Sequence, residues 1–286
     1  MSYASIPPLN AAAVLKRSGL RADKRLGQNF LQDSSALEKI AKAAEILTDD
    51  CVLEIGAGLG SLTRYLAVSA REVTAVELDA DLLAPLQAVL SPYRNVRVVH
   101  GDILKLSISE LIDQTNYIVA ANIPYHITSA IIRHLLEGEI KPRRIVLTVQ
   151  KEVAERICAE PGDLSLLALS VQVYGKPGIA ATIPAGSFHP VPKVDSAILR
   201  IDIYEEPLVP NDLLGRFFKL TKAGFSQKRK MLRNSLSSGL HIPPALAEAL
   251  LTSAGIDPMR RAETLSIEEW RIVCEKQLTD STNGNL

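Results

Sequence analysis

Residues 51–60, C-V-L-E-I-G-A-G-L-G, form an apolar run that closes in three glycines. A short apolar run ending at a turn is typical of a buried strand, and glycines there let the backbone approach a ligand. The dinucleotide-binding fingerprint is G-x-G-x-x-G, but here the third glycine, Gly60, comes one residue early and Ser61 holds its place. Taken alone, the stretch also fits a tight strand–helix turn without a ligand.

Apolar strand-like segments and amphipathic helix-like segments alternate on the C-terminal side of this turn. Strands are predicted at 51–58, 72–79, 96–102, 117–122 and 143–150, and helices at 61–70, 80–90, 128–138 and 151–160. Thr128 or Ser129 is a candidate N-cap for the third helix. Residues 164–177 and 196–204 resemble later strands or strand–helix pairs of the same domain. This alternation predicts an α/β domain with a mostly parallel sheet covered on both faces.

A stretch rich in prolines and acids, residues 204–212, marks a domain boundary. Beyond it, the pattern predicts helices at 212–225, 226–240, 243–255 and 266–278, and frayed chain at 280–286. We therefore expect one domain over residues 1–206, with a basic N-terminal segment, and a second, helical domain over residues 207–286. Trp270 is expected to pack the last helix.

The charges are balanced overall, with 32 basic and 32 acidic residues, but they are segregated. No acid falls between Asp212 and Glu248, and residues 16–25 carry five bases against one acid, Asp23. A single basic run is usually a solvated helix face, whereas two such runs on a neutral protein favour a polyanion such as nucleic acid. The candidate RNA-binding residues are Lys24, Arg25, Lys222, Lys228, Arg229, Lys230 and Arg233.

The chain is 47% hydrophobic, which is enough for a sizeable core, and it shows neither an N-terminal signal nor a transmembrane candidate. Its three cysteines are far apart and lack metal-ligand spacing. We therefore expect a cytoplasmic protein with no membrane partner and no metal site.

Carboxylates end two successive strands after the glycine turn. Glu77 comes about 20 residues after the first glycine, where an acid can bind ribose hydroxyls, and Asp102 ends the following strand. Adenosine offers both kinds of partner, two ribose hydroxyls and an exocyclic amine. Each acid alone could be an ordinary strand-end residue, but together they predict a nucleoside across the carboxyl edge of the sheet.

The fourth strand ends in the motif Asn122-Ile123-Pro124-Tyr125. An exocyclic amine on an aromatic ring is a poor nucleophile, and two acceptors around its N–H groups can hold it and favour pyramidalisation. The side-chain oxygen of Asn122 and the carbonyl of Ile123 could be these acceptors, Pro124 fixes the turn, and Tyr125 offers a ring for a flipped-out base. No general base is required, because the proton can leave to water after transfer. In isolation, the motif equally fits a helix cap and a turn.

The glycine turn with its following acids resembles the class I S-adenosylmethionine-dependent methyltransferase fold. That resemblance implies that Gly56 lies beside the methionine moiety, that Glu77 binds the ribose and Asp102 the adenine amine, and that Asn29 and Leu31 close over the cofactor. The cofactor-binding residues expected are Asn29, Leu31, Gly56, Gly58, Glu77, Asp102 and Asn122. S-adenosyl-L-homocysteine would be the product.

More specifically, the chain resembles the ribosomal RNA adenine N6-dimethyltransferases from about residue 16 to residue 275. The matching stretches are Asn-Ile-Pro-Tyr, LGQNFLQD (26–33), SFHPVPKVDSAILRI (187–201) and KRKMLRNSL with RAETLSIEEW, the last two resembling the C-terminal domain of the KsgA branch. In that resemblance Phe188 stacks on the base opposite Tyr125. The catalytic residues expected are thus Asn122, Ile123, Pro124, Tyr125 and Phe188.

The resemblance implies a monomeric enzyme that dimethylates N6 of two adjacent adenines in the 3′-terminal hairpin loop of small-subunit ribosomal RNA. It would act on a pre-30S particle late in assembly. Three alternatives stay open: a resistance-type dimethyltransferase of large-subunit RNA, a protein-glutamine methyltransferase, and a non-catalytic ribosome-assembly factor. The last would tolerate loss of Asn122.

Overall fold

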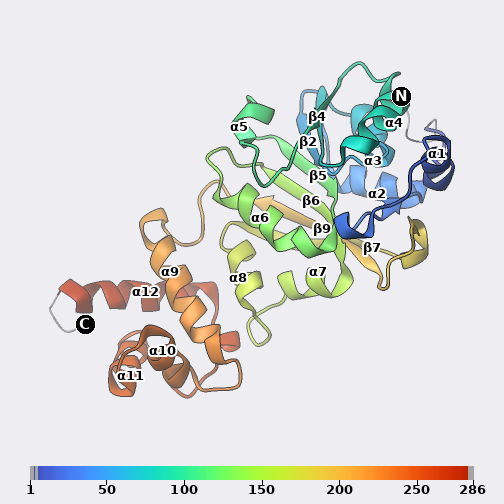
Figure 1. Cartoon of the computed structure of the whole chain (residues 1–286). Coiled ribbons are helices and arrows are strands. Elements are labelled where there is room, and N and C mark those ends of the chain that lie inside the picture. Colours follow the sequence, from blue (N-terminus) through green and yellow to red (C-terminus); the bar gives the residue numbers. More distant parts are fainter. Residues whose placement is uncertain (1–2, 4–5, 283–286) are drawn as a thin grey trace. The chain divides into compact units, whose positions relative to one another are not determined.

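The computed structural model describes residue 3 and residues 6–282, which group into two compact units (Figure 1). The first unit comprises Met1–Ala154 and Pro177–Ile203, and the second comprises Glu155–Lys176 and Tyr204–Leu286. The unit boundary after Ile203 lies near the expected domain boundary at residue 206. Residues 155–176, however, group with the C-terminal helices, because they form hydrogen bonds and ring contacts with that part of the chain.

Backbone and ring contacts explain this grouping. The N–H groups of Gly162 and Leu164 both donate to the carbonyl of Glu263, at 2.9 and 3.3 Å. The ring of Tyr174 stacks on Phe218 with centroids 6.3 Å apart. Residues 164–177, expected in the first domain as strands or strand–helix pairs, form helix α8 (Leu166–Gln172) followed by the start of a strand.

The first unit contains a seven-stranded sheet with the order β4-β3-β2-β5-β6-β9-β7. Its strands are β2 (Cys51–Ile55), β3 (Glu72–Glu77), β4 (Val96–His100), β5 (Ile118–Asn122), β6 (Arg144–Gln150), β7 (Gly175–Ile183) and β9 (Ser196–Ile203). Strands β4, β3, β2, β5 and β6 pair in parallel, and β9 pairs antiparallel with β6. The mostly parallel sheet predicted from the sequence is confirmed. Its parallel strands bring the ends of β2, β3 and β5 to one edge.

Among the described residues, two α-helices precede this sheet in the chain, and further helices follow its strands. They are α1 (Ala11–Arg17), α2 (Ser34–Ala44), α3 (Ser61–Ala67), α4 (Ala80–Leu90), α5 (Ile108–Leu111), α6 (Thr128–Glu137) and α7 (Lys151–Ile157). The predicted cap of α6 is wrong: the N-cap residue is Ile127, and the hydroxyl of Thr128 instead donates to the carbonyl of Tyr125 at 3.0 Å.

Helix α2 packs on the sheet because its apolar side chains fall on one face. Leu37 and Ile40 are buried with the sheet residues Ala120 and Val146 in one core cluster. At its N-terminus, the Asp33 carboxylate accepts from the N–H of Ser35 at 2.9 Å, which satisfies a free donor of the first turn.

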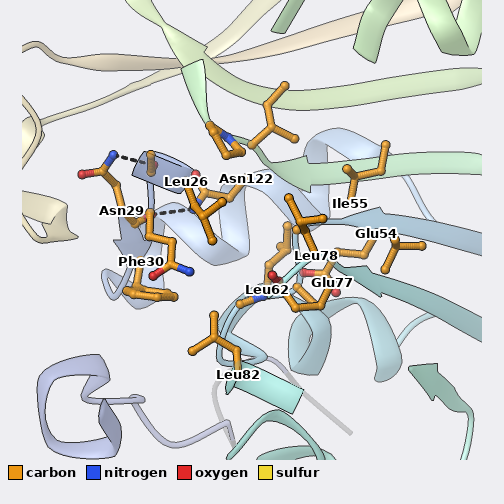
Figure 2. Close-up of a pocket in the computed structure, with 18 of the residues that line it drawn as sticks. Leu26, Asn29, Phe30, Glu54, Ile55, Leu62, Glu77, Leu78, Leu82 and Asn122 are labelled. Atoms are coloured by element: carbon orange, nitrogen blue, oxygen red, sulfur yellow. Dashed lines mark hydrogen bonds between the residues drawn. The ribbon is translucent and has the colours of Figure 1, made fainter. Parts of the chain in front are cut away.

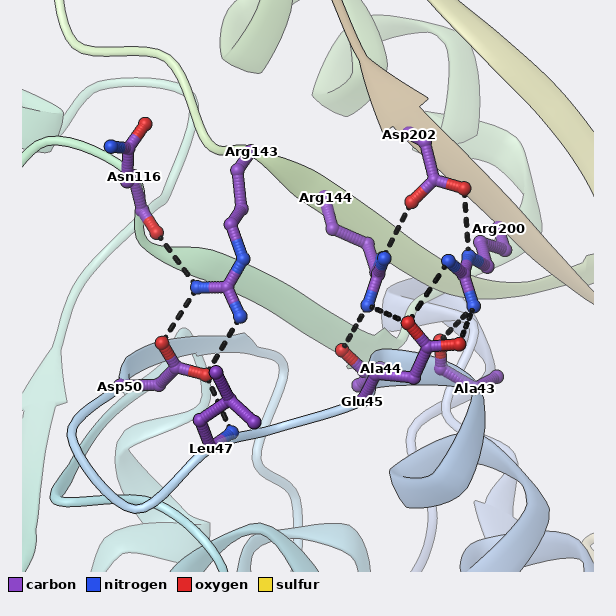
Figure 3. A network of polar contacts seen from close by, with 10 residues as sticks. All are labelled: Ala43, Ala44, Glu45, Leu47, Asp50, Asn116, Arg143, Arg144, Arg200 and Asp202. Carbon is purple, nitrogen blue, oxygen red and sulfur yellow. Dashed lines mark hydrogen bonds and ion pairs between the residues drawn. The ribbon is translucent and has the colours of Figure 1, made fainter.

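The C-terminus of α2 is held by arginines from two strands (Figure 3). Arg144 of β6 donates to the carbonyl of Ala44 at 2.9 Å. Arg144 and Arg200 of β9 both pair with Glu45, at 2.8 and 2.6 Å. Glu45 has the left-handed conformation, with φ of 46°. The cluster therefore fixes the end of α2 where the backbone is strained.

A small second sheet, which the sequence pattern did not predict, joins the N-terminal segment to residues 187–201. Strands β1 (Phe30–Leu31) and β8 (Phe188–His189) pair antiparallel, with Leu31 opposite Phe188. This pairing fixes LGQNFL next to the sheet edge at which the glycine turn lies.

The second unit is built from helices, as predicted beyond residue 212. After α8, these are α9 (Asn211–Gly224), α10 (Leu232–Leu240), α11 (Pro244–Ser253) and α12 (Ile267–Thr282). Trp270 is 0% exposed, and a Cβ on Gly224 would collide with its ring. The expected packing role of Trp270 is thus confirmed. Helix α12 continues to Thr282, past the start of the predicted frayed end, and residues 283–286 lie outside the described residues.

Candidate functional site: a pocket at the carboxyl edge of the sheet

A pocket lies at the carboxyl ends of β2, β3 and β5 (Figure 2). The N-terminal segment from Leu26 to Leu31 forms part of its wall. All seven residues expected to bind the cofactor line it, and so do Ile123, Pro124 and Tyr125. Residues far apart in the sequence therefore converge on one cavity.

The glycine turn at the end of β2 needs its glycines. Gly56, Gly58 and Gly60 have φ of 74°, 59° and 82°, a conformation that L side chains rarely adopt. A Cβ on Gly58 would lie 3.2 Å from the ring of Phe30, so the turn also packs tightly against the N-terminal segment. Gly56 and Gly58 line the pocket and place backbone rather than side chains of their own at its wall.

The carboxylate of Glu77 is fixed by the backbone around it. One oxygen accepts from the N–H of Gly58 at 2.7 Å and the other from the N–H of Asp79 at 2.9 Å. Burial raises the pKa of Glu77, while these backbone N–H groups oppose the rise. Each oxygen keeps a further lone pair, so the group can also accept from hydroxyls of a ligand.

Asp102 is held more loosely. One oxygen accepts from the N–H of Leu104 at 3.1 Å, and the other lies 3.6 Å from the ammonium of Lys105. Its side chain is 31% exposed. The carboxylate thus borders the pocket with acceptor capacity on its open side.

The wall formed by the N-terminal segment is tied to β3 and α4 through Gln28. The Gln28 amide donates to the carboxylate of Asp79 at 2.6 Å, and its oxygen accepts from the N–H of Asp23 at 2.8 Å. Asp79 in turn donates its N–H to Glu77. Gln28 therefore connects this segment to the carboxylate that borders the pocket.

The orientation of the Asn122 amide is set by its contact with Asn29. Its Nδ2 donates to the carbonyl of Asn29 at 3.0 Å. A carbonyl can only accept, so the nitrogen must face Asn29, and the Oδ1 atom is directed away from it as an acceptor. Figure 2 shows Asn122 beside Asn29 at the pocket wall.

The residues after Asn122 form a stiff turn. Pro124 is extended, with φ of −60° and ψ of 133°, and a short helical turn follows over Tyr125–Ile127. The Tyr125 hydroxyl lies 2.6 Å from the hydroxyl of Ser196. Burial raises the pKa of Tyr125, so the phenol stays neutral at ordinary pH.

Comparison with known proteins agrees with this arrangement. The model of the family described as ribosomal RNA adenine dimethylase matches residues 19–277. This chain belongs to the ribosomal RNA adenine dimethylase family. The resemblance predicted for residues 16 to 275 is thereby confirmed, as are the enzyme class and the use of S-adenosylmethionine.

Relatives cover nearly all of the chain. "Ribosomal RNA small subunit methyltransferase A" of Dehalococcoides mccartyi (strain CBDB1) is 47% identical, over 95% of this chain and 94% of its own. The protein of the same name from Geobacillus kaustophilus is 41% identical over 92% and 93%.

Two solved structures share the fold. A dimethyladenosine transferase from Plasmodium falciparum covers 89% of this chain and 98% of its own, with a TM-score of 0.75 and 26% identity. The 23S rRNA methyltransferase ErmE covers 87% and 99%, with a TM-score of 0.69 and 32% identity. The predicted class I methyltransferase fold is therefore confirmed.

One expected dimethylase residue, Phe188, is placed differently from the prediction. Its ring is 2% exposed and packs in the core cluster that contains Leu31, Leu37 and Ile40. Its antiparallel pairing with Leu31 directs the chain into that core. A base could reach this ring only if the ring left the core, so the expected stacking from the side opposite Tyr125 is not available in this structure.

The sequence reasoning missed Glu54 as a residue of the dimethylase pocket. It lines the pocket, is 1% exposed, and its Oε2 atom has no hydrogen-bond partner within the described part of the chain. Burial raises the pKa of Glu54 to about 8, and the nearby Glu77 adds to the rise. The available signal was an acid inside the otherwise apolar strand C-V-L-E-I.

The candidate RNA-binding residues lie in both units. Lys24 and Arg25 are exposed in the first unit, but Arg25 pairs with Asp23 at 2.8 Å. In the second unit Lys222, Lys228, Arg229 and Lys230 are exposed, whereas Arg233 pairs with Glu248 at 2.8 Å.

Of the helices described, none is both long and apolar enough to span a bilayer.

Proposed function

We propose that this dimethylase transfers methyl groups to N6 of two adjacent adenines, two to each, in the 3′-terminal hairpin loop of small-subunit ribosomal RNA. It would act on a pre-30S particle late in assembly and, since ribosomes assemble there, in the cytoplasm. The observation that carries the proposal is the amide of Asn122, whose nitrogen is held by Asn29 so that its oxygen is left as an acceptor at the pocket. The names of the relatives support the small subunit as the source of the RNA.

The pocket residues fit S-adenosylmethionine. Gly56 and Gly58 leave backbone exposed at the turn, and Glu77 is held where it can accept from ribose hydroxyls. Asp102 would accept from the adenine amine, with Asn29 and Leu31 at the wall. The buried Oε2 of Glu54 is unpartnered among the described residues, and a cationic ligand beside it would lower the raised pKa of Glu54 and favour the carboxylate that pairs with it. When bound, this cofactor supplies an electrophilic methyl group on a sulfonium.

The chain's own contribution is to hold the target amine. The Oδ1 of Asn122 and the carbonyl of Ile123 would accept from the two N–H groups of adenine N6, which localises the nitrogen lone pair. Tyr125 would stack on the flipped base. Positioning of this kind can lower a barrier by roughly 7–11 kcal/mol. No general base is needed, because the proton of the methylated amine can leave to water after transfer.

The exposed lysines and arginines of the two basic segments would bind the RNA backbone. Phosphate contacts fix the register of a protein on its nucleic acid, whereas base contacts at the pocket select the nucleotide. Lys24, Lys222, Lys228, Arg229 and Lys230 are exposed and therefore suited to this role. Arg25 and Arg233 would first have to leave their acidic partners.

A dimethylase of large-subunit RNA is the second candidate. The similarity to the 23S rRNA methyltransferase ErmE, at 32% identity, favours it. The relatives named for the small subunit are more similar, at up to 47% identity across 95% of the chain. We therefore prefer the small-subunit substrate.

A labelled-methyl assay tests the proposal. Small subunits that lack the modification, large subunits and a release factor are offered separately with labelled cofactor, and the product nucleoside is identified. Dimethyladenosine in the small-subunit RNA is the expected product. Label in large subunits would support the second candidate, label in the release factor would indicate a protein methyltransferase, and binding without label would indicate a non-catalytic assembly factor.

A further inference from the structure

Tyr125 is attached to the central sheet through its hydroxyl. The phenol oxygen lies 2.6 Å from the Oγ atom of Ser196, a short hydrogen bond between two hydroxyls. Ser196 is 0% exposed, whereas Tyr125 is half-buried and lines the pocket. One end of the ring is thus fixed in the protein interior while the ring itself borders the cavity.

Ser196 is a rigid attachment point. It is the first residue of β9 and pairs with Gln150, the last residue of β6. The preceding residue, Asp195, accepts from the N–H of Lys151 through its carbonyl at 3.1 Å and from the N–H of Ala185 through its carboxylate at 2.9 Å. The serine therefore lies between a fixed turn and a sheet strand.

The other end of the tyrosine is equally constrained. Its backbone follows Pro124, and its carbonyl accepts from the hydroxyl of Thr128 at 3.0 Å. With the backbone and the phenol oxygen both held, rotation about the Cα–Cβ bond would break the bond to Ser196. Rotation about the Cβ–Cγ bond would not, because the phenol oxygen lies on that axis. The position of the ring axis is therefore set by two anchor points in different parts of the sequence.

We infer that Ser196 is a positioning residue for methyl transfer: its hydroxyl fixes the axis of the Tyr125 ring at the position where the target base stacks. This inference rests on the proposed function, since it assigns the ring to the base. Ser196 itself does not touch the base or the cofactor.

Loss of the hydrogen bond should lower the rate of transfer more than it weakens substrate binding. A ring whose axis is free to move still contacts the base, but the amine is no longer held at the acceptor atoms. We expect Ser196→Ala to lower the single-turnover rate about 5- to 30-fold, since a displacement of about 1 Å can cost ~100-fold. The KM for undermethylated small subunits should stay within about threefold.

The test compares Ser196→Ala, Tyr125→Phe and the double variant. Each single variant leaves one buried hydroxyl without its partner, so it should lower stability, whereas the double variant removes both hydroxyls and should regain most of that stability. If the bond positions the ring, all three variants stay slow in transfer. If its role is only structural, the rate recovers together with the stability, and that result would overturn the inference.

A second readout does not depend on activity. NMR relaxation of ring-¹³C-labelled tyrosine reports the motion of Tyr125, whose signal is assigned by its absence in Tyr125→Phe. Ser196→Ala should increase that motion, and unchanged motion of the ring would also overturn the inference.

Thr74→Val is the control, because it removes the buried hydroxyl that donates to the carbonyl of Leu111 at 3.3 Å, away from the pocket. It should lower stability without changing the Tyr125 signal or the rate. If wild type labels no small subunits, the proposed function fails, while the NMR comparison still reports whether Ser196 holds the ring.

Discussion

The side chain of Asn122 donates to the backbone carbonyl of Asn29, 93 positions earlier in the chain, at 3.0 Å. The contact joins the end of β5 to the segment that closes the pocket. It also decides which end of the amide is left as an acceptor, because the carbonyl of Asn29 can only accept. A glutamate or aspartate at position 122 could not make this contact without a proton.

Removal of this amide should greatly lower the rate of methyl transfer and change the affinity for the cofactor little. We expect Asn122→Ala to lower the single-turnover rate by ~100-fold or more, as for the loss of one preorganised polar group, with the cofactor dissociation constant within a few fold. Rapid-quench transfer of labelled methyl and calorimetry measure the two quantities. Asn95→Ala is the matched control, since the Asn95 amide also donates to backbone carbonyls, those of Ala67 and Ala70, but away from the pocket. A wild-type rate in Asn122→Ala would exclude the acceptor role.

The two acids at the pocket should differ in their effects. Glu77→Ala leaves the N–H groups of Gly58 and Asp79 without their partner, so it should lower both cofactor affinity and stability, by about 1–3 kcal/mol each. Asp102→Ala should lower affinity with little change in stability, because its side chain is partly exposed. Calorimetry and urea unfolding distinguish the two. Unchanged affinity in both variants would contradict the nucleoside placement.

The sheet edge and its acids could be predicted because they depend on local patterns. Each strand of the parallel sheet is an apolar run in the sequence, and Glu77 and Asp102 fall where such runs stop. The pairing of Phe30–Leu31 with Phe188–His189 could not, since a two-residue strand has no periodicity. The burial of the Phe188 ring follows from that pairing, so the position of this ring could not be predicted for the same reason. Glu54 was missed because a strand position does not reveal whether its side chain faces a ligand or a helix.

Glu54 makes a testable contribution to the pH dependence of stability. Its pKa in the folded protein is about 8, above the ordinary value for a glutamate of 4.5. The folded state therefore binds more protons than the unfolded state between these values, and stability from this group falls as pH rises from about 4.5 to 8. Glu54→Gln should remove this part of the slope. Urea unfolding at pH 5.5, 7 and 8.5 checks it, and equal slopes for the two proteins would show that Glu54 is ionised in the fold.

The arginine cluster at the end of α2 should act in the opposite direction. The hydrogen bond from Arg200 lowers the pKa of Glu45; burial would raise the pKa of Asp202, but Arg200 and Arg144 hold it below its ordinary value. The stability that these two acids contribute is present above the unfolded pKa values and is lost as pH falls through the folded ones, below about pH 4. Arg144→Ala should cost about 1–2 kcal/mol at neutral pH, less than a buried pair, because Glu45 and Asp202 are about half exposed. Thermal unfolding at pH 7 and pH 3.5 should show this difference shrinking in acid.

The salt dependence of binding affinity tests whether the basic segment of the second unit contacts RNA. Each phosphate contact adds roughly 0.7 to 0.9 to the log–log slope of affinity against salt, so Lys228, Arg229 and Lys230 together should contribute roughly 2 to 3. Replacing these three with glutamine should flatten the slope by that amount. Arg233→Gln alone should change it least, because Arg233 already pairs with Glu248. Binding of undermethylated small subunits between 50 and 200 mM salt measures the slopes. Lys42→Gln is the control, because the ammonium of Lys42, in the first unit, pairs with Glu38 at 2.7 Å. A wild-type slope in the triple variant would mean that the segment is a solvated face that does not contact phosphates. A large effect of Arg233→Gln would mean that Arg233 leaves the carboxylate of Glu248 for a phosphate on binding.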